Sequence, residues 1–229
     1  MDVAVDRPFP PDDVPDWGQV ETVCLDMDGT VLDLRFDNYF WLEALPRRYA
    51  ALHGISAEAA LTSLMPRFDA WRGTLEWYCV AHWTEELGID VTALKFELRE
   101  HIRYLPGAVE FLDRLGALGK RRLLTTNAHP KSLAVKHGRT GIGQHFDELV
   151  SAHDIGVPKE SPEFWARLTA RHAIDPAATL FVDDSPAVLR AAREAGLRWI
   201  YQVLQPDSTQ PPRARLPGIP GVRVLAELV

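Results

Sequence analysis

The chain has 229 residues, of which 46% are hydrophobic and 25% are charged, and its formal net charge at pH 7 is −7. This composition is typical of a globular protein with a full core, and the length fits one core domain with an inserted module. The negative charge, without any sizeable Lys/Arg cluster, argues against a nucleic-acid polymer as partner. No apolar stretch is long enough to span a membrane, so a membrane partner is not expected.

The N-terminal stretch MDVAVDRPFPPDDVPDWG is acidic and rich in proline. It lacks the basic start and the apolar stretch of a secretory signal peptide, and we expect residues 1–19 to form a flexible leader. Cys24 and Cys79 therefore predict reduced, buried thiols in a cytoplasmic protein. The eight histidines show no metal-ligand spacing, so zinc is not expected.

The first predicted strand, VETVCLD, covers residues 20–26. The chain from 34 to 104 then shows helical patterns without a clear strand, and we interpret it as an all-helical cap inserted after the first strand. Its predicted helices cover residues 37–52, 56–72, 74–87 and 91–104. Pro46 and Pro66 are expected to kink or divide their helices.

From Leu105 onward, short apolar runs alternate with helical patterns. The later strands are predicted to end at Asn127, near Ala152, at Asp184 and at Leu204. This alternation is typical of an α/β protein with a Rossmann-like parallel sheet and helices on both faces. We expect the core to combine residues 20–33 and 105–229, with a proline-rich surface loop before a short C-terminal element.

Unusual polar residues follow the predicted strand ends. They are Asp26 and Asp28, Thr126 and Asn127, Lys159, and Asp183 and Asp184. Because ligands of open parallel sheets bind outside the carboxyl ends of the strands, we expect these side chains to line one pocket. Four carboxylates in one pocket repel each other unless a cation joins them, and an all-oxygen ligand set selects Mg²⁺.

The same pattern predicts a phosphate beside the metal. Lys159 immediately precedes the predicted helix SPEFWARLTARH, where the helix dipole disfavours a cation unless both face a shared anion. Thr126 and Asn127 are candidate hydrogen-bond donors to phosphate oxygens. Asp184, with the main-chain carbonyl at residue 28, is the expected metal holder, and the candidate metal carboxylates are Asp26, Asp28, Asp183 and Asp184.

Two of these acids have the geometry for covalent catalysis. Asp26, at the strand end, is placed to attack phosphorus and form an aspartyl-phosphate. Asp28 is placed to protonate the leaving oxygen and then to activate water. Gly29 allows a sharp turn and is expected to bring main-chain N–H groups near the phosphate.

These four motifs, DMDGT, the strand-terminal Thr126, Lys159 and the DD pair, resemble those of the haloacid dehalogenase-like hydrolases. The resemblance runs from residue 20 to the end of the fourth strand and implies the helical cap and Mg²⁺-dependent aspartyl-phosphate chemistry. The stretches DMDGTVLDLRFDNYFW, TLEWYCVAHWTEELG, TNAHPKSLAVK, PKE and LFVDDS are similar, further, to bacterial purine 5′-nucleotidases of that superfamily, which hydrolyse GMP and IMP.

The sequence departs from the superfamily pattern at two positions. Many members carry an aspartate where this chain has Val188, and Asp183 is the candidate for that outer role at the metal. Glu160 stands where a proline commonly follows the lysine. In the cap, Asn38 and Arg72 are the candidate substrate contacts.

We therefore expect a phosphomonoesterase acting on a small phosphorylated substrate, a purine nucleoside 5′-monophosphate. The alternatives are a phosphatase of sugar phosphates or phosphoglycolate, and a phosphate-accepting signalling or binding protein. Dehalogenation is disfavoured because it needs neither a metal nor an acid at Asp28. No pattern in the sequence assigns an oligomeric state.

Overall fold

The computed structural model describes residues 14–229, so most of the expected leader lies outside the described residues. The last part of the leader is held against the core, which differs from the expectation of a flexible segment. The indole Nε1 of Trp17 donates to the main-chain oxygen of Leu228 at 2.8 Å, and Lys120 Nζ donates to the main-chain oxygen of Trp17 at 2.7 Å. The Trp17 ring also packs against the hydrophobic core.

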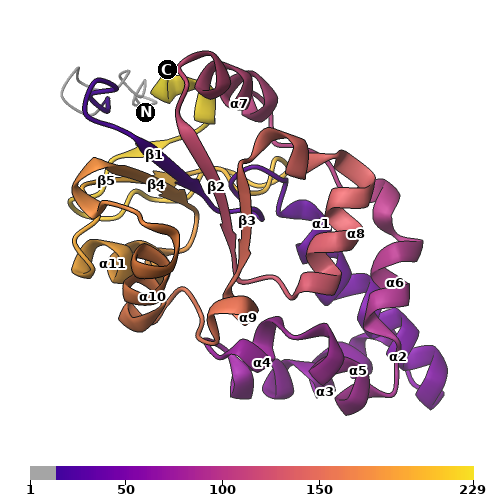
Figure 1. Cartoon of the computed structure of the whole chain (residues 1–229). Helices are drawn as coiled ribbons and strands as arrows, with labels where there is room; N and C mark the ends of the chain where they lie inside the picture. Colours follow the sequence, from indigo (N-terminus) through magenta and orange to yellow (C-terminus); the bar gives the residue numbers. More distant parts are fainter. Residues whose placement is uncertain (1–13) are drawn as a thin grey trace, which may run out of the picture.

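The core is a six-stranded, all-parallel sheet with the strand order β3-β2-β1-β4-β5-β6 (Figure 1). The strands are β1 Thr22–Leu25, β2 Arg121–Thr126, β3 Glu148–Ser151, β4 Thr179–Asp183, β5 Trp199–Val203 and β6 Gly221–Val222. The five predicted strands are all present, each slightly shorter than its apolar run. The short C-terminal element pairs with β5 as β6 and is followed by a 3₁₀ turn, Leu225–Leu228.

Successive residues of each strand point to opposite faces of the sheet, so a strand buried on both sides reads as a continuous apolar run. Val23 and Leu25 belong to one hydrophobic cluster, and Cys24 belongs to the other. The core helices are α7 Ala108–Ala117, α8 Pro130–Thr140, α9 Ala152–Ile155, α10 Pro162–His172 and α11 Pro186–Glu194. Side chains of α7 enter the first cluster and those of α10 and α11 enter the second, so helices cover both faces, as predicted.

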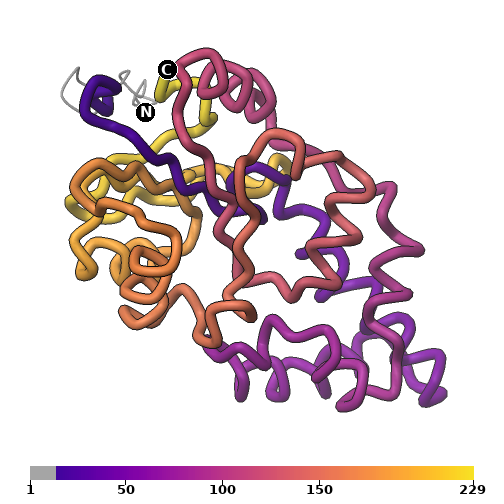
Figure 2. The backbone as a smooth tube through the Cα atoms, viewed as in Figure 1, coloured from indigo at the N-terminus to yellow at the C-terminus, as the bar shows by residue number. Residues whose placement is uncertain are grey.

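Between β1 and α7 the chain forms the helical segment (Figure 2). Its elements are α1 Arg35–Tyr39, a π-helical turn Phe40–Ala44, α2 Leu45–His53, α3 Ala57–Trp71, α4 Leu75–Tyr78, α5 Val80–Leu87, α6 Val91–Glu97 and a 3₁₀ turn Arg99–His101. Its side chains and those at the carboxyl ends of the strands line one cavity. The all-α insertion of the predicted fold is therefore present.

The helical segment differs from the prediction in the division of its helices. Pro66, which was expected to kink or divide its helix, lies inside α3, and the helix runs unbroken past it with Leu64 and Phe68 buried on either side. The helix predicted over residues 74–87 is instead divided at Cys79, which is extended (φ −85°, ψ 106°). Neither glycine nor proline marks that break in the sequence.

Candidate active site

Three acids and one lysine meet at the carboxyl ends of β1 and β4, and we call them the acid cluster: Asp26, Asp183, Asp184 and Lys159. The ammonium of Lys159 lies 2.5 Å from Asp26 Oδ1 and 2.7 Å from Asp183 Oδ2, and it also donates to the main-chain oxygen of Thr125 at 2.9 Å. All four side chains are buried. Lys159 therefore forms ion pairs with two of these carboxylates, and all four side chains lie in the pocket that was predicted from the strand ends.

The loop that carries Lys159 is held by Asn127, at the end of β2. Asn127 Oδ1 accepts from the main-chain N–H of Lys159 at 2.9 Å, and its Nδ2 donates to Glu160 Oε2 at 2.9 Å. Glu160 also accepts from the Tyr78 hydroxyl at 2.6 Å, which joins the helical segment to this loop. The sequence analysis treated Glu160 only as a missing proline, and no local signal marked it as a bridge.

Thr126 and Gly29 are placed differently with respect to a phosphate. The hydroxyl oxygen of Thr126 accepts from the Ala128 N–H at 3.0 Å, so its hydrogen stays free to donate. Gly29 has φ +87°, and a Cβ there would lie 2.8 Å from Asp184 Cγ, so only glycine fits the turn. Its own N–H donates to the main-chain oxygen of Leu32 at 2.7 Å, and the placement of other main-chain N–H groups of this turn near a phosphate stays a prediction.

A second charge group, which we call the lysine cluster, consists of the half-buried Asp37 and the buried Lys95 and Lys136. Lys95 Nζ lies 2.9 Å from Asp37 Oδ1, and Lys136 Nζ lies 2.6 Å from Asp37 Oδ2. Lys136 also lies 2.5 Å from Asp28 Oδ1 and so links this cluster to the predicted acid/base. The sequence analysis missed both lysines, because in each helix they have the spacing of ordinary solvated residues.

The two clusters shift carboxyl pKa values in opposite directions. Burial raises the pKa of Asp26 to about 7 although Lys159 opposes it, and burial likewise raises the pKa of Asp184 to about 7. Burial raises the pKa of Asp28 to about 6, against the opposing field of Lys136. Burial would also raise the pKa of Asp37, but its two lysines outweigh it and hold the pKa below its ordinary value.

The acid cluster has the donor set for a hard divalent cation. Oxygens of Asp26, Asp183 and Asp184 lie within 4.8 Å of one another. Both oxygens of Asp183 already accept hydrogen bonds, from Lys159 and from the Ser185 N–H, which suits an outer position at the metal. Burial raises the pKa values of these three carboxyls, which disfavours their ionised forms unless a cation is present, and an all-oxygen set fits Mg²⁺. The Asp28 side chain is not part of this oxygen group.

Asp184 has one further partner that the sequence analysis did not find. Arg213 Nη1 donates to Asp184 Oδ2 at 2.9 Å. Arg213 lies in the proline-rich segment that was predicted to be a surface loop. The loop therefore contacts a residue that lines the pocket. Arg213 binds Oδ2 of Asp184 and does not bind Oδ1.

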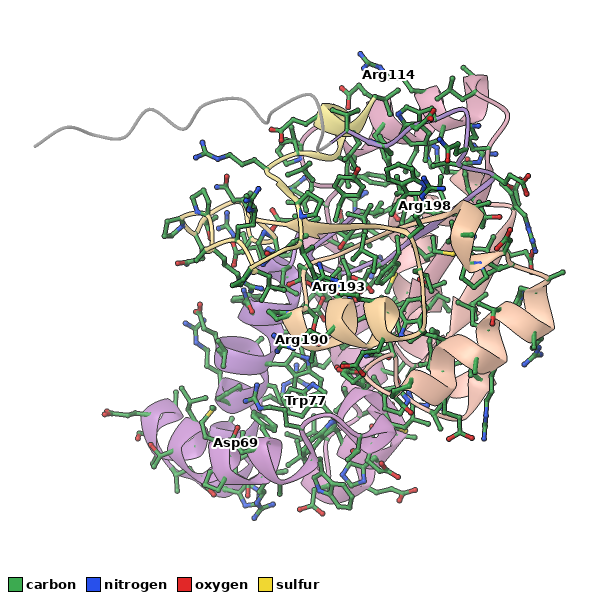
Figure 3. The ribbon with its side chains drawn as sticks, turned by 90° about the vertical axis from the view of Figure 1, so that its left-hand side faces the viewer. Asp69, Trp77, Arg114, Arg190, Arg193 and Arg198 are labelled. Carbon is green, nitrogen blue, oxygen red and sulfur yellow. The ribbon has the colours of Figure 1, made fainter. Side chains whose placement is uncertain are left out.

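The clusters open into a cavity of about 360 Å³, a size typical of small-molecule sites. The helical segment contributes an apolar and aromatic wall: Trp41, Leu42, Met65, Phe68 and Trp77. Trp41 and Trp77 stack with their ring planes 22° apart, and Figure 3 shows Trp77 where the helical segment meets the core.

Asn38 and Arg72, the two candidate substrate contacts, both line this cavity. Asn38 Nδ2 donates to Asp207 at 2.7 Å, which leaves its amide oxygen as an acceptor. Arg72 pairs with Asp69 at 2.7 Å and lies 5.5 Å from the centre of the Trp77 ring. Both side chains therefore have partners at the cavity wall.

A parallel sheet with an all-helical insertion, and acids, a threonine and a lysine gathered at its carboxyl edge, define a phosphatase-type hydrolase. Residues 20–196 match the model of the haloacid dehalogenase-like hydrolases, and the chain belongs to this family. It is an enzyme, as the sequence analysis predicted. Within residues 14–229, none of the helices combines the length and the apolar character needed to cross a bilayer.

Several relatives are close in sequence or in fold. The chain is 42% identical over 192 residues to GMP/IMP nucleotidase YrfG of Escherichia coli (strain K12), covering 84% of this chain and 86% of that protein. The YrfG protein of Shigella flexneri matches equally. A phosphatase of the same family from Thermococcus onnurineus superposes with a TM-score of 0.76 at 20% identity, over 91% of this chain and 96% of that one, which shows the shared fold.

Proposed function

We propose that the chain is a Mg²⁺-dependent phosphomonoesterase that hydrolyses purine nucleoside 5′-monophosphates, GMP or IMP, through an aspartyl-phosphate on Asp26. The observation that carries this proposal is that buried acids and buried lysines line one cavity. The three carboxylates of the acid cluster are paired with Lys159 and Arg213, and the ammonium groups of Lys95 and Lys136 face Asp37 and Asp28. Such a cavity offers carboxylate oxygens to a cation and ammonium groups to a phosphate.

In the first step, an oxygen of Asp26 attacks phosphorus and the bond to the nucleoside O5′ breaks. Lys159, 2.5 Å away, favours the ionised form that this attack needs. Asp28 gives its proton to O5′ and takes a proton from the water that then attacks the aspartyl-phosphate, releasing inorganic phosphate. A pKa near 6 suits a group that must act as acid and as base.

Thr126 would donate to a phosphoryl oxygen, while Asn127 acts by holding the Lys159 loop. Mg²⁺ would be held by Asp26 and Asp184, with Asp183 outside them, and when bound it would neutralise charge on the phosphoryl oxygens. For Asp28, the main-chain carbonyl rather than the side chain is the proposed metal contact.

The nucleotide assignment draws on two supports. The relatives of 42% identity bear the name GMP/IMP nucleotidase. The aromatic wall of the cavity, with the Trp41–Trp77 pair, offers flat surfaces on which a purine can stack. We propose that residues 34–104 act as a cap that selects the substrate, with Asn38 and Arg72 contacting it, over a catalytic core of residues 20–33 and 105–229. The free thiols Cys24 and Cys79 support a cytoplasmic location.

Phosphate release from a panel of nucleoside, sugar and glycolate monophosphates, with and without Mg²⁺, tests the proposal. We expect turnover only with Mg²⁺, highest kcat/KM for GMP or IMP, and none in Asp26→Asn. Full activity in Asp26→Asn or without a divalent ion would overturn the mechanism. Equal rates on sugar phosphates or phosphoglycolate would overturn the nucleotide assignment, and a stable phosphoryl group without phosphate release would favour a signalling or binding role.

A further inference from the structure

A cysteine and two histidines come together at the seam between the helical segment and the sheet. Cys79 lies between α4 and α5, His129 precedes α8, and His153 lies in α9. One ligand atom of each, a sulfur and two ring nitrogens, lies within 4.8 Å of the others. None of these residues takes part in the proposed phosphatase chemistry, and 50 residues separate the first from the second along the sequence.

The side chains of this cluster have few competing partners within residues 14–229. His153 Nε2 is buried and has no hydrogen-bond partner, which is costly for a polar atom. The Cys79 sulfur accepts a long contact, 3.5 Å, from the His82 N–H. The His129 Nδ1 accepts from the Lys131 N–H at 3.2 Å, which leaves its Nε2 for another partner.

We propose that Cys79, His129 and His153 form a binding site for Zn²⁺ or a similar borderline-soft divalent cation. One thiolate and two imidazoles are the ligands that such ions prefer, and three protein ligands leave the fourth tetrahedral position to water. The all-oxygen acid cluster selects a hard ion, so the two sites differ in the metal they take. The proposal is independent of the phosphatase assignment.

Metal uptake has defined proton requirements. The Cys79 thiol loses its proton to become a thiolate, and each ring must present an unprotonated nitrogen. Burial lowers the pKa of His129 and of His153, which favours their neutral forms. Binding through His129 Nε2 places the ring proton on Nδ1, so the long contact from Lys131 is given up. All three side chains are half-buried, and solvent reaches them.

A bound ion would cross-link elements that are far apart in sequence. It would join the α4–α5 break to the starts of α8 and α9, beside the hydrogen bond from Tyr78 to Glu160. Figure 1 shows α9 next to α4 at this seam. The extended conformation of Cys79, which divides the predicted helix, places its sulfur at the seam. We therefore expect Zn²⁺ to raise the thermal stability of the full chain.

Titration of the chelator-treated full-length protein with Co²⁺ and with Zn²⁺ tests the site, with excess Mg²⁺ present to occupy the acid cluster. Co²⁺ should give a thiolate-to-metal charge-transfer band at one equivalent, and Zn²⁺ should remove it by displacement. Cys79→Ser should abolish the band, and His153→Ala should weaken binding by more than the roughly 10–100-fold typical of losing an outer-shell partner. Cys24→Ser, which changes the other thiol, should bind as the unchanged protein does.

Circular dichroism of each metal-free variant checks that it is folded. His153→Gln provides a second variant of similar size if the alanine variant does not fold. Absence of the charge-transfer band in the folded, unchanged protein would overturn the proposal. So would a band of equal strength and affinity in folded Cys79→Ser or in either His153 variant.

Discussion

The acid cluster and the lysine cluster differ in the charge that lies at their centre. In the first, Lys159 lies between two carboxylates, and in the second, Asp37 lies between two ammonium groups. Burial raises the pKa of Asp26 to about 7 although Lys159 opposes it, whereas two lysines outweigh burial and hold the pKa of the half-buried Asp37 below its ordinary value. The number of lysines that face each carboxyl is one source of this difference.

The difference in pKa suggests different roles for the aspartates of the two clusters. Asp37 is fully compensated and should act mainly as a structural anion that holds two buried lysines. The pKa values of Asp26 and Asp184 are raised to about 7, so we expect a bound cation to stabilise the folded chain there. Asp28 belongs to neither cluster but touches Lys136, and it can exchange a proton in the range where its pKa, about 6, lies.

The largest expected effect comes from Asp28→Asn, which tests whether the group between the clusters carries the proton transfers. We expect kcat to fall by close to 10⁴-fold, the upper end for an acid/base group, because Asp28 acts in both steps. Steady-state kinetics on the preferred nucleotide and on a nitrophenyl phosphate measure it. The rate of the first step should fall less for the nitrophenyl ester, since its leaving group needs no proton. Equal losses of under tenfold for both substrates would contradict this role.

Asp37→Asn should break the lysine cluster by leaving the buried Lys95 without its anion and Lys136 with Asp28 alone. We expect a loss of about 3–5 kcal/mol in the free energy of unfolding, measured by urea denaturation at pH 7. Because the folded pKa of Asp37 lies below its ordinary value of 3.8, its contribution to stability is present above pH 3.8 and is lost as pH falls further. The difference between the two proteins should therefore shrink in acid. A constant difference across that range would contradict the assignment.

Gly29→Ala should damage the acid cluster specifically. A Cβ at φ +87° costs about 1–3 kcal/mol in strain and would press on Asp184 at 2.8 Å. We expect reduced stability and weaker Mg²⁺ binding, both measured by thermal melts over a Mg²⁺ series. Gly88→Ala, also at positive φ (+66°) but with nothing near its Cβ, is the matched control. It should lose stability without any change in Mg²⁺ affinity.

Mg²⁺ should stabilise the chain more at pH 8 than at pH 6. Without metal, the raised pKa values of Asp26 and Asp184, about 7, mean that folding takes up protons between pH 4 and 7, so stability falls as pH rises through that window. Mg²⁺ binds the ionised carboxylates. At a concentration of ten times its Kd, it adds about 1.4 kcal/mol to the free energy of unfolding. Calorimetric melts with and without Mg²⁺ measure this. A smaller Mg²⁺ effect at pH 8 than at pH 6 would contradict it, and Asp184→Asn should remove the effect.

The smallest expected effect is that of Tyr78→Phe, which removes the hydroxyl that donates to Glu160. The acid cluster depends on this bridge through the Lys159 loop, whereas the lysine cluster has its own links. We expect a loss of about 0.5–1.5 kcal/mol in the free energy of unfolding. Asp37→Asn should lower this free energy by the same amount in the Tyr78→Phe background as in the unchanged protein. Strong coupling between the two substitutions would show that the clusters are not separate.

The strand ends were predictable because parallel strands place their carboxyl ends on one edge. Asp26, Thr126 and Lys159 could therefore be assigned to one pocket from the order of apolar runs alone. The pattern did not reveal Lys95 or Lys136, since a lysine buried by tertiary contacts has the same helical spacing as a solvated one.

Other features depend on contacts over long separations. Arg213 reaches Asp184 from a loop whose prolines indicated only a surface position. The break at Cys79 and its meeting with two histidines follow no local spacing rule.

The sequence by itself determined the sheet, the helical insertion and the polar residues that gather at the strand ends, because local hydrophobic periodicity and strand-end position carry that information. Only the tertiary structure decided how the charges are compensated. It placed one lysine between two acids and one acid between two lysines, and ionisation inside a protein depends on partners a few ångströms away, wherever they lie in the chain.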